Sequence, residues 1–344
     1  MKAGIFYGPH DIRVEEVEDP KIKLPTDAIL RVTHTCICGS DLWWYRGVTE
    51  RKASGQIGHE FMGEVIKVGD EVKNIKIGDL VIGPFFWCDG TCPECKKGMS
   101  SACLNGGSWG NKGTTGCQAE QLRVPFADAN LFTIPKDTDV KLMPALLALS
   151  DVMGTGHHAA VSAGVTKGSV VAVVGDGAVG LCAVLASKRL GAEKIILMSS
   201  HEKNTKVGKL FGATDSIPDR GQEGIEKVKD LTEGIGADCV LECVGGKDAR
   251  EMAMAMVRPG GRVGCVGVPH DVPDMPVGDI FWKNITIGGG IAPTASYTPE
   301  LLKDVLSLTI DPSAVFDMTL PLSELAKGYE AMDKREAIKV LIKP

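Results

Sequence analysis

The stretch VVAVVGDGAVG, residues 170–180, decides the fold of the second half of this chain. Its leading apolar residues predict a buried β-strand, and the Gly-x-Gly-x-x-Gly pattern after them opens an Ala- and Leu-rich helix over residues 178–190. In such a pattern the first glycine permits a tight turn, the second lets the backbone approach a pyrophosphate, and the third lets the helix pack on the strand. This context favours a dinucleotide-binding loop over a glycine-rich turn that binds nothing. The residues expected to hold the dinucleotide here are Gly175, Gly177, Ala178, Val179 and Gly180.

Strand and helix continue to alternate after this loop. A second helix is expected to end near Gly212, and apolar runs predict further strands between helix-length segments. The strands expected in this half are residues 170–174, 194–198, 237–244, 262–268 and 284–287. Strands that alternate with helices in this way predict a doubly wound parallel sheet, which is an α/β fold.

The end of the second predicted strand decides which form of the dinucleotide is expected. An NAD site usually carries Asp or Glu there, where the carboxylate accepts hydrogen bonds from the ribose. Ser199 occupies that position in this chain, so no carboxylate there repels a 2'-phosphate, although the nearby Glu202 weakens the argument. We expect NADP(H) to be favoured over NAD(H), with hydrogen bonds to the phosphate from Ser199, Ser200, His201 and Lys203.

The first half of the chain has a different pattern, in which short strands such as residues 61–68 and 80–82 are separated by glycine-rich turns. This indicates a mostly β domain. The tail contains an amphipathic helix over residues 322–332 and a strand over residues 337–342, and it is too short for a domain of its own. We therefore expect the tail to return to the first domain. The predicted boundaries are 1–152 with 291–344 for the β domain and 153–290 for the dinucleotide-binding domain.

The amino-acid composition disfavours several classes of binding partner. The net charge is -6, from 38 basic and 44 acidic residues, which disfavours binding to nucleic acid or to anionic lipid. No apolar run is long enough to span a membrane, and the N-terminus lacks the apolar core of a secretory signal, so a cytoplasmic protein is expected. In that compartment 11 cysteines indicate metal ligands and buried thiols rather than disulfides. Small, mostly neutral molecules are the expected partners.

Two short motifs in the first half predict a metal site. Cys-Gly-Ser-Asp at residues 38–41 is followed by Gly-His-Glu at residues 58–60. A thiolate and an imidazole together can bind zinc, and an open coordination position can then hold a substrate oxygen. A second cysteine cluster lies within residues 88–103. The motifs therefore indicate metal-assisted redox chemistry.

These motifs, in this order and with a late dinucleotide fold, resemble the zinc-dependent alcohol dehydrogenases of the medium-chain dehydrogenase/reductase family. The resemblance covers essentially the whole chain. It implies a GroES-like catalytic domain interrupted by a Rossmann domain, an active site in the cleft between them, and hydride transfer between the dinucleotide and a small alcohol, aldehyde or ketone. It also implies a homodimer or a homotetramer, without a choice between the two.

The resemblance assigns roles to residues on both sides of the metal. The catalytic zinc would be held by Cys38, His59 and Asp151, with Glu60 as an alternative ligand or a close neighbour. Asp41 would contact the far nitrogen of His59 and fix its tautomer. Asp151 could instead cap the following turn, and Asp41 and Glu60 could be ordinary surface acids.

The resemblance also assigns the first proton carrier and one cofactor contact. Ser40 would pass a proton to or from the substrate oxygen. The histidine that often extends this relay is replaced by Trp43, so water, the cofactor ribose or His34 is left as the outer carrier. Thr155 would pack against the nicotinamide.

The second cysteine cluster resembles the family's structural zinc lobe, which makes two zinc ions per chain. Cys92, Cys95 and Cys103 match the family pattern well. The fourth ligand is Cys88 or Asp89, and Cys88 is slightly favoured because sulfur is the softer donor. A lobe without metal, or a set of free thiols, is the alternative.

Substrate identity is the least determined feature. Trp43, Phe85 and Trp109 lie beside segments that line the substrate cleft in the resembling enzymes, and an aromatic pocket would favour aliphatic or aromatic alcohols and carbonyls. The same rings could instead fill the core or a subunit interface. Two other functions stay open: a polyol or amino-alcohol dehydrogenase on the same fold, and a non-enzymatic nucleotide-binding protein.

Overall fold

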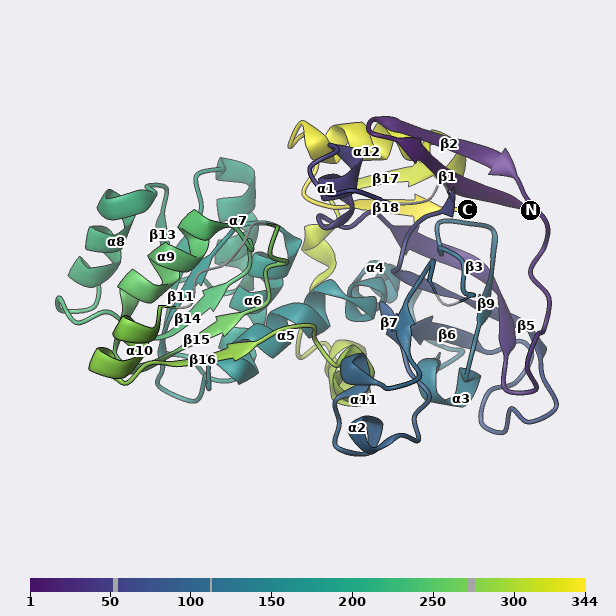
Figure 1. Cartoon of the computed structure of the whole chain (residues 1–344), viewed down its shortest axis with the longest axis horizontal. Helices are drawn as coiled ribbons and strands as arrows, with labels where there is room; N and C mark the ends of the chain where they lie inside the picture. The colour runs from purple at the N-terminus through teal and green to yellow at the C-terminus, as the bar shows by residue number, and fades with distance from the viewer. Residues whose placement is uncertain (52–54, 112, 271–275) are drawn as a thin grey trace. The chain divides into compact units, whose positions relative to one another are not determined.

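The computed structural model describes residues 1–51, 55–111, 113–270 and 276–344. The chain divides into two compact units, Met1–Gly154 with Pro293–Pro344, and Thr155–Ala292 (Figure 1). Helix α5 (Val152–Ser162) carries the chain from the first unit into the second. None of the helices within the described residues is both long and apolar enough to cross a membrane.

The first unit is built mainly from antiparallel strands. Its largest sheet has the order β10-β6-β5-β3-β18-β17, and β9 also pairs with β3. Strand β3 is central because it pairs with β5, β9 and β18, and its apolar side chains enter the core. The strands of this unit are β1 (Lys2–Gly8), β2 (Asp11–Glu16), β3 (Ala28–Cys36), β4 (Gly55–Gln56), β5 (Phe61–Val68), β6 (Leu80–Gly83), β7 (Phe86–Trp87), β8 (Gly107–Ser108), β9 (Gln121–Val124), β10 (Phe132–Ile134), β17 (Met318–Pro321) and β18 (Val340–Lys343).

Helices of the first unit are short, apart from two in the tail. The tail strand β18 pairs antiparallel with β3, with Leu341 opposite Cys36, so the end of the chain joins the main sheet of this unit. Tyr329 and Leu325 of α12 are buried in the same core cluster as Ile37. The helices are α1 (Asp41–Tyr45), α2 (Pro93–Lys96), α3 (Ala127–Asn130), α4 (Met143–Leu147), α11 (Thr294–Leu306) and α12 (Leu325–Asp333), with 3-10 turns η1 (Ser100–Ala102), η2 (Val140–Leu142), η3 (Ala148–Ser150), η4 (Ser313–Val315) and η5 (Leu322–Glu324).

The second unit is the predicted parallel sheet, with strand order β13-β12-β11-β14-β15-β16. Its strands are β11 (Val170–Val174), β12 (Lys194–Met198), β13 (Asp215–Ile217), β14 (Ala237–Glu242), β15 (Val257–Cys265) and β16 (Thr286–Gly289). Its helices after α5 are α6 (Ala178–Arg189), α7 (Glu202–Phe211), α8 (Gly221–Asp230), α9 (Lys247–Met256) and α10 (Val277–Lys283). The α/β part of the fold is therefore confirmed, as is the mostly β character of the first unit.

Helices cover both faces of this sheet (Figure 1). Ala172 and Val174 of β11 point into a core cluster with residues of α8 and α9. The other face meets α6 and α7, where Gly208 of α7 lies so close to Leu197 that a Cβ would be 2.3 Å from its Cδ2. Both faces are buried, which explains the nearly continuous apolar sequence of the central strands.

The loop that precedes α6 lies at the point where the strand order reverses. Strand β11 has β12 on one side and β14 on the other, so the loop after it opens at the carboxyl edge of the sheet between two crossovers. Ligands of open α/β sheets bind at this kind of position. Later boundaries differ from the prediction: β14 ends at Glu242, and β15 begins at Val257 because a strand here continues through the Pro259-Gly260-Gly261 segment that usually signals a turn.

Candidate active site

Four potential metal ligands of the first unit lie close together in space. One donor atom each from Cys38, His59, Glu60 and Asp151 lies within 4.8 Å of the others. Cys38 follows β3, His59 and Glu60 precede β5, and Asp151 precedes α5, so the main sheet fixes three of the backbone positions. Cys38, Glu60 and Asp151 are buried, and the His59 side chain is 18% exposed.

The distances in this cluster suit a small ion. Nε2 of His59 lies 3.4 Å from Oδ2 of Asp151, and Sγ of Cys38 lies 3.5 Å from the same oxygen. A tetrahedral zinc with metal–ligand distances of about 2.0 to 2.3 Å places its ligand atoms about 3.3 to 3.8 Å apart. The thiolate, imidazole and carboxylate therefore fit a zinc ion both in chemistry and in spacing.

The electrostatics of the cluster also call for a cation. Burial, followed by repulsion from Asp151, raises the pKa of the Cys38 thiol. Burial lowers the pKa of His59, but attraction to Asp41 and Cys38 more than offsets this and raises that pKa well above its usual range. Anionic donors gathered in a buried place are stabilised by a positive charge among them.

The Asp41 carboxylate contacts both His59 and the Cys38 backbone. Oδ1 of Asp41 lies 3.5 Å from Nδ1 of His59, the ring nitrogen that faces away from Asp151. Oδ2 of Asp41 accepts a hydrogen bond from the Cys38 backbone N–H at 3.1 Å and another from the Tyr329 hydroxyl at 3.3 Å. One carboxylate thus contacts both the loop that carries the sulfur and the imidazole.

Glu60 is held by a buried lysine. Nζ of Lys339 donates to Oε1 of Glu60 at 2.6 Å and to the Ile37 carbonyl at 3.2 Å, and both charged side chains are buried. Burial raises the pKa of Glu60 although the Lys339 ammonium lowers it. Oε2 of Glu60 has no hydrogen-bond partner among the described residues, and Nε2 of His59 lies 3.9 Å from its Oε1.

The glycine loop of the second unit has room for a phosphate. Gly175 has a φ of 110°, which favours glycine, and a Cβ on Gly180 would lie 1.9 Å from the Gly175 carbonyl oxygen. Gly177 has open space where its Cβ would be, just before the first N–H groups of α6, which have no acceptor within the helix. A dinucleotide phosphate therefore fits this loop, and any larger residue at Gly177 would fill the space.

A side-chain network lies beside this loop, after β12. Oδ2 of Asp176 accepts a hydrogen bond from Oγ of Ser199 at 2.9 Å and lies 2.8 Å from Nδ1 of His201. Ser200 and Lys203 are exposed, and Glu202 is 83% exposed and paired with Lys206. The carboxylate nearest to Ser199 in this network therefore comes from Asp176 of the loop, whereas the sequence had pointed to Glu202.

Models of two protein families match this chain: the alcohol dehydrogenase GroES-like domain at residues 24–136 and the zinc-binding dehydrogenase domain at residues 178–307. Zinc-type alcohol dehydrogenase B of Aspergillus flavus is 33% identical over 350 residues, which are 100% of this chain and 81% of that protein. This chain belongs to the zinc-dependent medium-chain alcohol dehydrogenases. As a member of that family, it is a zinc-dependent oxidoreductase.

Other members of the family are similar over their whole length. Formaldehyde dismutase of Pseudomonas putida is 31% identical over 390 residues, which cover 100% of this chain and 97% of that protein. The solved structure of alcohol dehydrogenase TADH from Thermus sp. ATN1 has a TM-score of 0.92 and 34% identity, and the match covers 100% of this chain and 99% of that one.

The second cysteine cluster of this alcohol dehydrogenase also gathers four donors. They are Asp89, Cys92, Cys95 and Cys103, again within 4.8 Å of one another. Burial opposes ionisation of Asp89, but hydrogen bonds from the Cys92 and Thr91 backbone and from the Asn105 amide hold its pKa well below the usual range. Cys88, which the sequence slightly favoured as the fourth ligand, is not in this group. Its backbone is bonded to the Asn130 amide, and its Sγ lies 4.0 Å from the Ala129 carbonyl.

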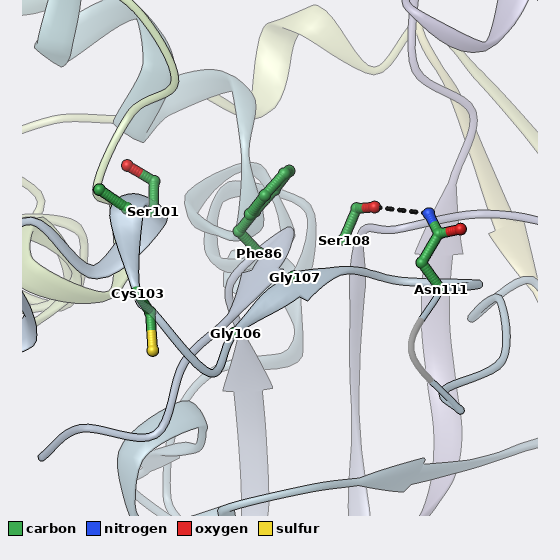
Figure 2. A pocket seen from close by; sticks show the side chains of 8 residues that line it. Phe86, Ser101, Cys103, Gly106, Gly107, Ser108 and Asn111 are labelled. Carbon is green, nitrogen blue, oxygen red and sulfur yellow. Dashed lines mark hydrogen bonds between the residues drawn. The ribbon is translucent and has the colours of Figure 1, made fainter. Parts of the chain in front are cut away.

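A shallow pocket of about 430 Å³ lies beside this cluster (Figure 2). A hydrogen bond from Asn111 to the Ser108 hydroxyl, 2.8 Å long, lies at one end of it. Its lining contains no charged side chain and none of the donors around His59. The lining residues are Phe86, Ser101, Ala102, Cys103, Gly106, Gly107, Ser108 and Asn111.

The aromatic residues expected at the substrate differ in their surroundings. The Phe85 ring packs edge-on to the His59 ring, with centroids 6.2 Å apart, and Trp43 is half-buried on α1 beside the Cys38 loop. Trp109 is buried in the core against Phe61, and its indole N–H donates to the Pro84 carbonyl. The packing of Trp109 corresponds to the alternative that the sequence left open, a core position.

The remaining predicted residues lie as follows. Ser40 is half-buried at the start of α1, two positions after Cys38, and its side chain does not cap that helix. His34 is on β3, where its Nδ1 lies 3.1 Å from the Thr33 hydroxyl. Thr155 is buried in the first turns of α5.

Sequence reasoning missed three residues that contact these sites: Lys339, Tyr329 and Asp176. A lone lysine inside the apolar run of residues 337–342 was a usable signal, because a charge on the buried face of a strand requires a partner. Asp176 was visible between the two glycines. No sequence pattern near Tyr329 indicated that its side chain contacts the site.

Proposed function

We propose that this alcohol dehydrogenase binds its catalytic zinc through Cys38, His59 and Asp151 and transfers hydride between NADP(H) and a small alcohol, aldehyde or ketone. The observation that carries the proposal is the spacing of these donors: Nε2 of His59 and Sγ of Cys38 lie 3.4 and 3.5 Å from Oδ2 of Asp151. Two negative donors and one neutral imidazole balance a divalent ion and leave a coordination position for the substrate oxygen.

When bound, zinc supplies Lewis acidity toward the substrate oxygen and the nicotinamide supplies or accepts hydride. The protein's own side chains orient the metal ligands and move the proton. Asp41 fixes the tautomer of His59 through Nδ1, so that Nε2 is left to bind the metal. The Ser40 hydroxyl passes the proton to or from the substrate oxygen. Lys339 keeps Glu60 beside the site as a reserve ligand whose free oxygen, Oε2, has no other partner among the described residues.

The cofactor proposal assigns residues 153–290 to dinucleotide binding and residues 1–152 with 291–344 to catalysis. Gly175, Gly177, Ala178, Val179 and Gly180 would contact the pyrophosphate, and Thr155 the nicotinamide. The preference for NADP(H) over NAD(H) rests on Ser199, Ser200, His201 and Lys203, which offer donors and no carboxylate of their own to a 2'-phosphate.

We also propose a second, structural zinc, held by Asp89, Cys92, Cys95 and Cys103. The gathered donors and the ionised state of Asp89 support this set over one with Cys88. Four protein ligands leave no open position, which suits a structural role.

The substrate class rests on the family and on its named relatives, which include alcohol dehydrogenases and a formaldehyde dismutase. Phe85 and Trp43 would form the apolar side of the substrate site. A polyol or amino-alcohol substrate is the second candidate, and a non-enzymatic nucleotide-binding role is the third.

We further propose a homodimer or homotetramer, supported by Phe281 and Trp282 of α10, which are 69% and 81% exposed. The cytoplasmic location stays a prediction.

The test combines zinc analysis with initial rates. Purified protein should contain two zinc ions per chain and should oxidise NADPH faster than NADH with small aldehydes and ketones, more slowly with polyol-derived or amino ketones. Asp151→Asn should lose one zinc and turnover, while Asp11→Asn, which removes an exposed acid of the same unit, should keep both. An Asp151→Asn protein with both zinc ions would refute the ligand set. A Ser199→Asp variant with an unchanged NADPH to NADH ratio would remove the basis of the cofactor preference.

A further inference from the structure

The carboxylate of Asp176 contacts the residue at the strand end from which a dinucleotide fold usually reads the ribose. That position follows the second strand of the sheet, which here is β12, and Ser199 is the first residue after it. Oδ2 of Asp176 is 2.9 Å from the Ser199 hydroxyl. The acid that is missing from the strand end is therefore supplied by the glycine loop.

The network around Asp176 fixes this carboxylate in place. The Asn204 amide of α7 donates to the Asp176 carbonyl at 2.7 Å, and the Thr205 hydroxyl donates to Ser199 at 2.9 Å. The Asp176 side chain is 14% exposed, while His201 beside it is 34% exposed. A carboxylate bound from two directions and largely covered does not move freely into solvent.

This placement opposes a 2'-phosphate in two ways. The carboxylate repels a group that carries a charge of about -1.5 to -2 at neutral pH. It also engages Ser199 and His201, two of the donors that we assigned to the phosphate. A ribose hydroxyl has the opposite preference, because it can donate a hydrogen bond to the carboxylate.

We propose that Asp176 is a specificity-determining residue that reads the 2' position of the adenosine ribose and disfavours the phosphorylated form. The inference rests on the proposed dinucleotide site, but it holds whether the wild-type protein prefers NADP(H) or NAD(H). It predicts the direction in which that preference shifts when the charge of Asp176 is removed.

The experiment measures the affinity of two cofactor fragments by calorimetry, 2',5'-ADP and 5'-AMP, and needs no turnover. Asp176→Asn should raise the ratio of 2',5'-ADP to 5'-AMP affinity by about tenfold or more, because the charge is lost while the side-chain shape is kept. Asp176→Ala should shift the ratio in the same direction, and it tests the proposal if the amide variant does not fold. Asp176→Glu should leave the sign of the preference unchanged. Glu223→Gln, which removes an exposed charge from α8 of the same unit, should leave the ratio unchanged.

The outcomes separate this inference from the proposed function. Fragments that bind to the wild type with a ratio that stays within twofold in Asp176→Asn and Asp176→Ala would overturn the role of Asp176 alone. Equal weakening of both fragments would also overturn it, because that result identifies a purely structural role for the loop. A zinc-loaded wild type that binds neither fragment would overturn the proposed dinucleotide site together with the inference.

Discussion

Replacing Lys339 by methionine should destabilise the first unit by about 3 to 5 kcal/mol, the usual loss when one partner of a buried ion pair is removed. Methionine keeps most of the aliphatic stem, so the change removes the ammonium group and little packing volume. The ammonium lies 2.6 Å from Oε1 of Glu60 and 3.2 Å from the Ile37 carbonyl, and neither charged side chain is accessible to water that could replace it. The variant therefore leaves Glu60 as an unbalanced buried acid.

A second variant, at Glu60, tests how much of this loss of stability comes from each partner of the ion pair. Glu60→Gln removes the carboxylate charge but keeps a side-chain oxygen that accepts from Lys339, so it should cost less than Lys339→Met, at most about 3 kcal/mol. The double variant carries neither charge, so its loss should be smaller than the sum of the single losses by at least about 1 kcal/mol. Lys343→Met is the matched control, because Lys343 is exposed at the end of β18, the strand that Lys339 immediately precedes. It should change stability by less than about 0.5 kcal/mol.

Urea unfolding followed by tryptophan fluorescence is the appropriate assay, because it reports mainly on the first unit. The one tryptophan of the second unit, Trp282, is 81% exposed and should respond little to unfolding. The tryptophans of the first unit are Trp43, Trp44, Trp87 and Trp109. A loss below about 1 kcal/mol for Lys339→Met, or additive effects in the double variant, would show that this pair is not coupled and would refute the reasoning.

Three further predictions concern the Tyr329 hydroxyl, the glycine loop before α6 and the zinc ions. Tyr329→Phe removes the hydrogen bonds of the Tyr329 hydroxyl to Gln118 and Asp41 and should destabilise the first unit by about 1 to 2 kcal/mol in the same urea assay; an unchanged midpoint would contradict a stabilising role of this hydroxyl. Gly180→Ala should abolish binding of NADPH and NADH in a fluorescence titration while both zinc ions remain, because its Cβ would lie 1.9 Å from the Gly175 carbonyl oxygen; tight binding would show that the loop can shift. Removal of zinc with a chelator should lower the urea midpoint of the first unit, and equal midpoints with and without zinc would show that the metal does not contribute to its stability.

The parts of this structure that the sequence predicted are those encoded locally. Residues 170–180 contain a strand, a turn and a helix start within one short segment, and β11 and α6 begin at the predicted residues. The β domain was predicted in the same way, since β5 spans the expected Phe61–Val68. By contrast, the sequence patterns did not predict α11, which has 13 residues and contains Pro299, a residue type that usually interrupts a helix.

Contacts between distant segments were the part that sequence patterns could not provide. Glu60 and Lys339 are 279 positions apart, and only the pairing of β18 with β3 brings the tail to the metal cluster. The choice between Cys88 and Asp89 had the same difficulty at short range. Softness of the donor favoured Cys88, but the backbone at Cys88 is bonded to Asn130, while the Asp89 carboxylate faces the other three cysteines.

The metal cluster is best understood as a balance of buried charge. Cys38, Asp151, Glu60 and Asp41 can each carry a negative charge, and the structure buries all of them near one buried cation, Lys339. Burial raises the pKa values of Cys38 and Glu60, which disfavours their charged forms. The proposed divalent ion between Cys38 and Asp151 would neutralise both of these anions, and Lys339 would then balance Glu60. Asp41 accepts hydrogen bonds from the Cys38 backbone N–H and the Tyr329 hydroxyl and lies 3.5 Å from Nδ1 of His59, an arrangement that would fix the tautomer of His59 for the proposed metal binding.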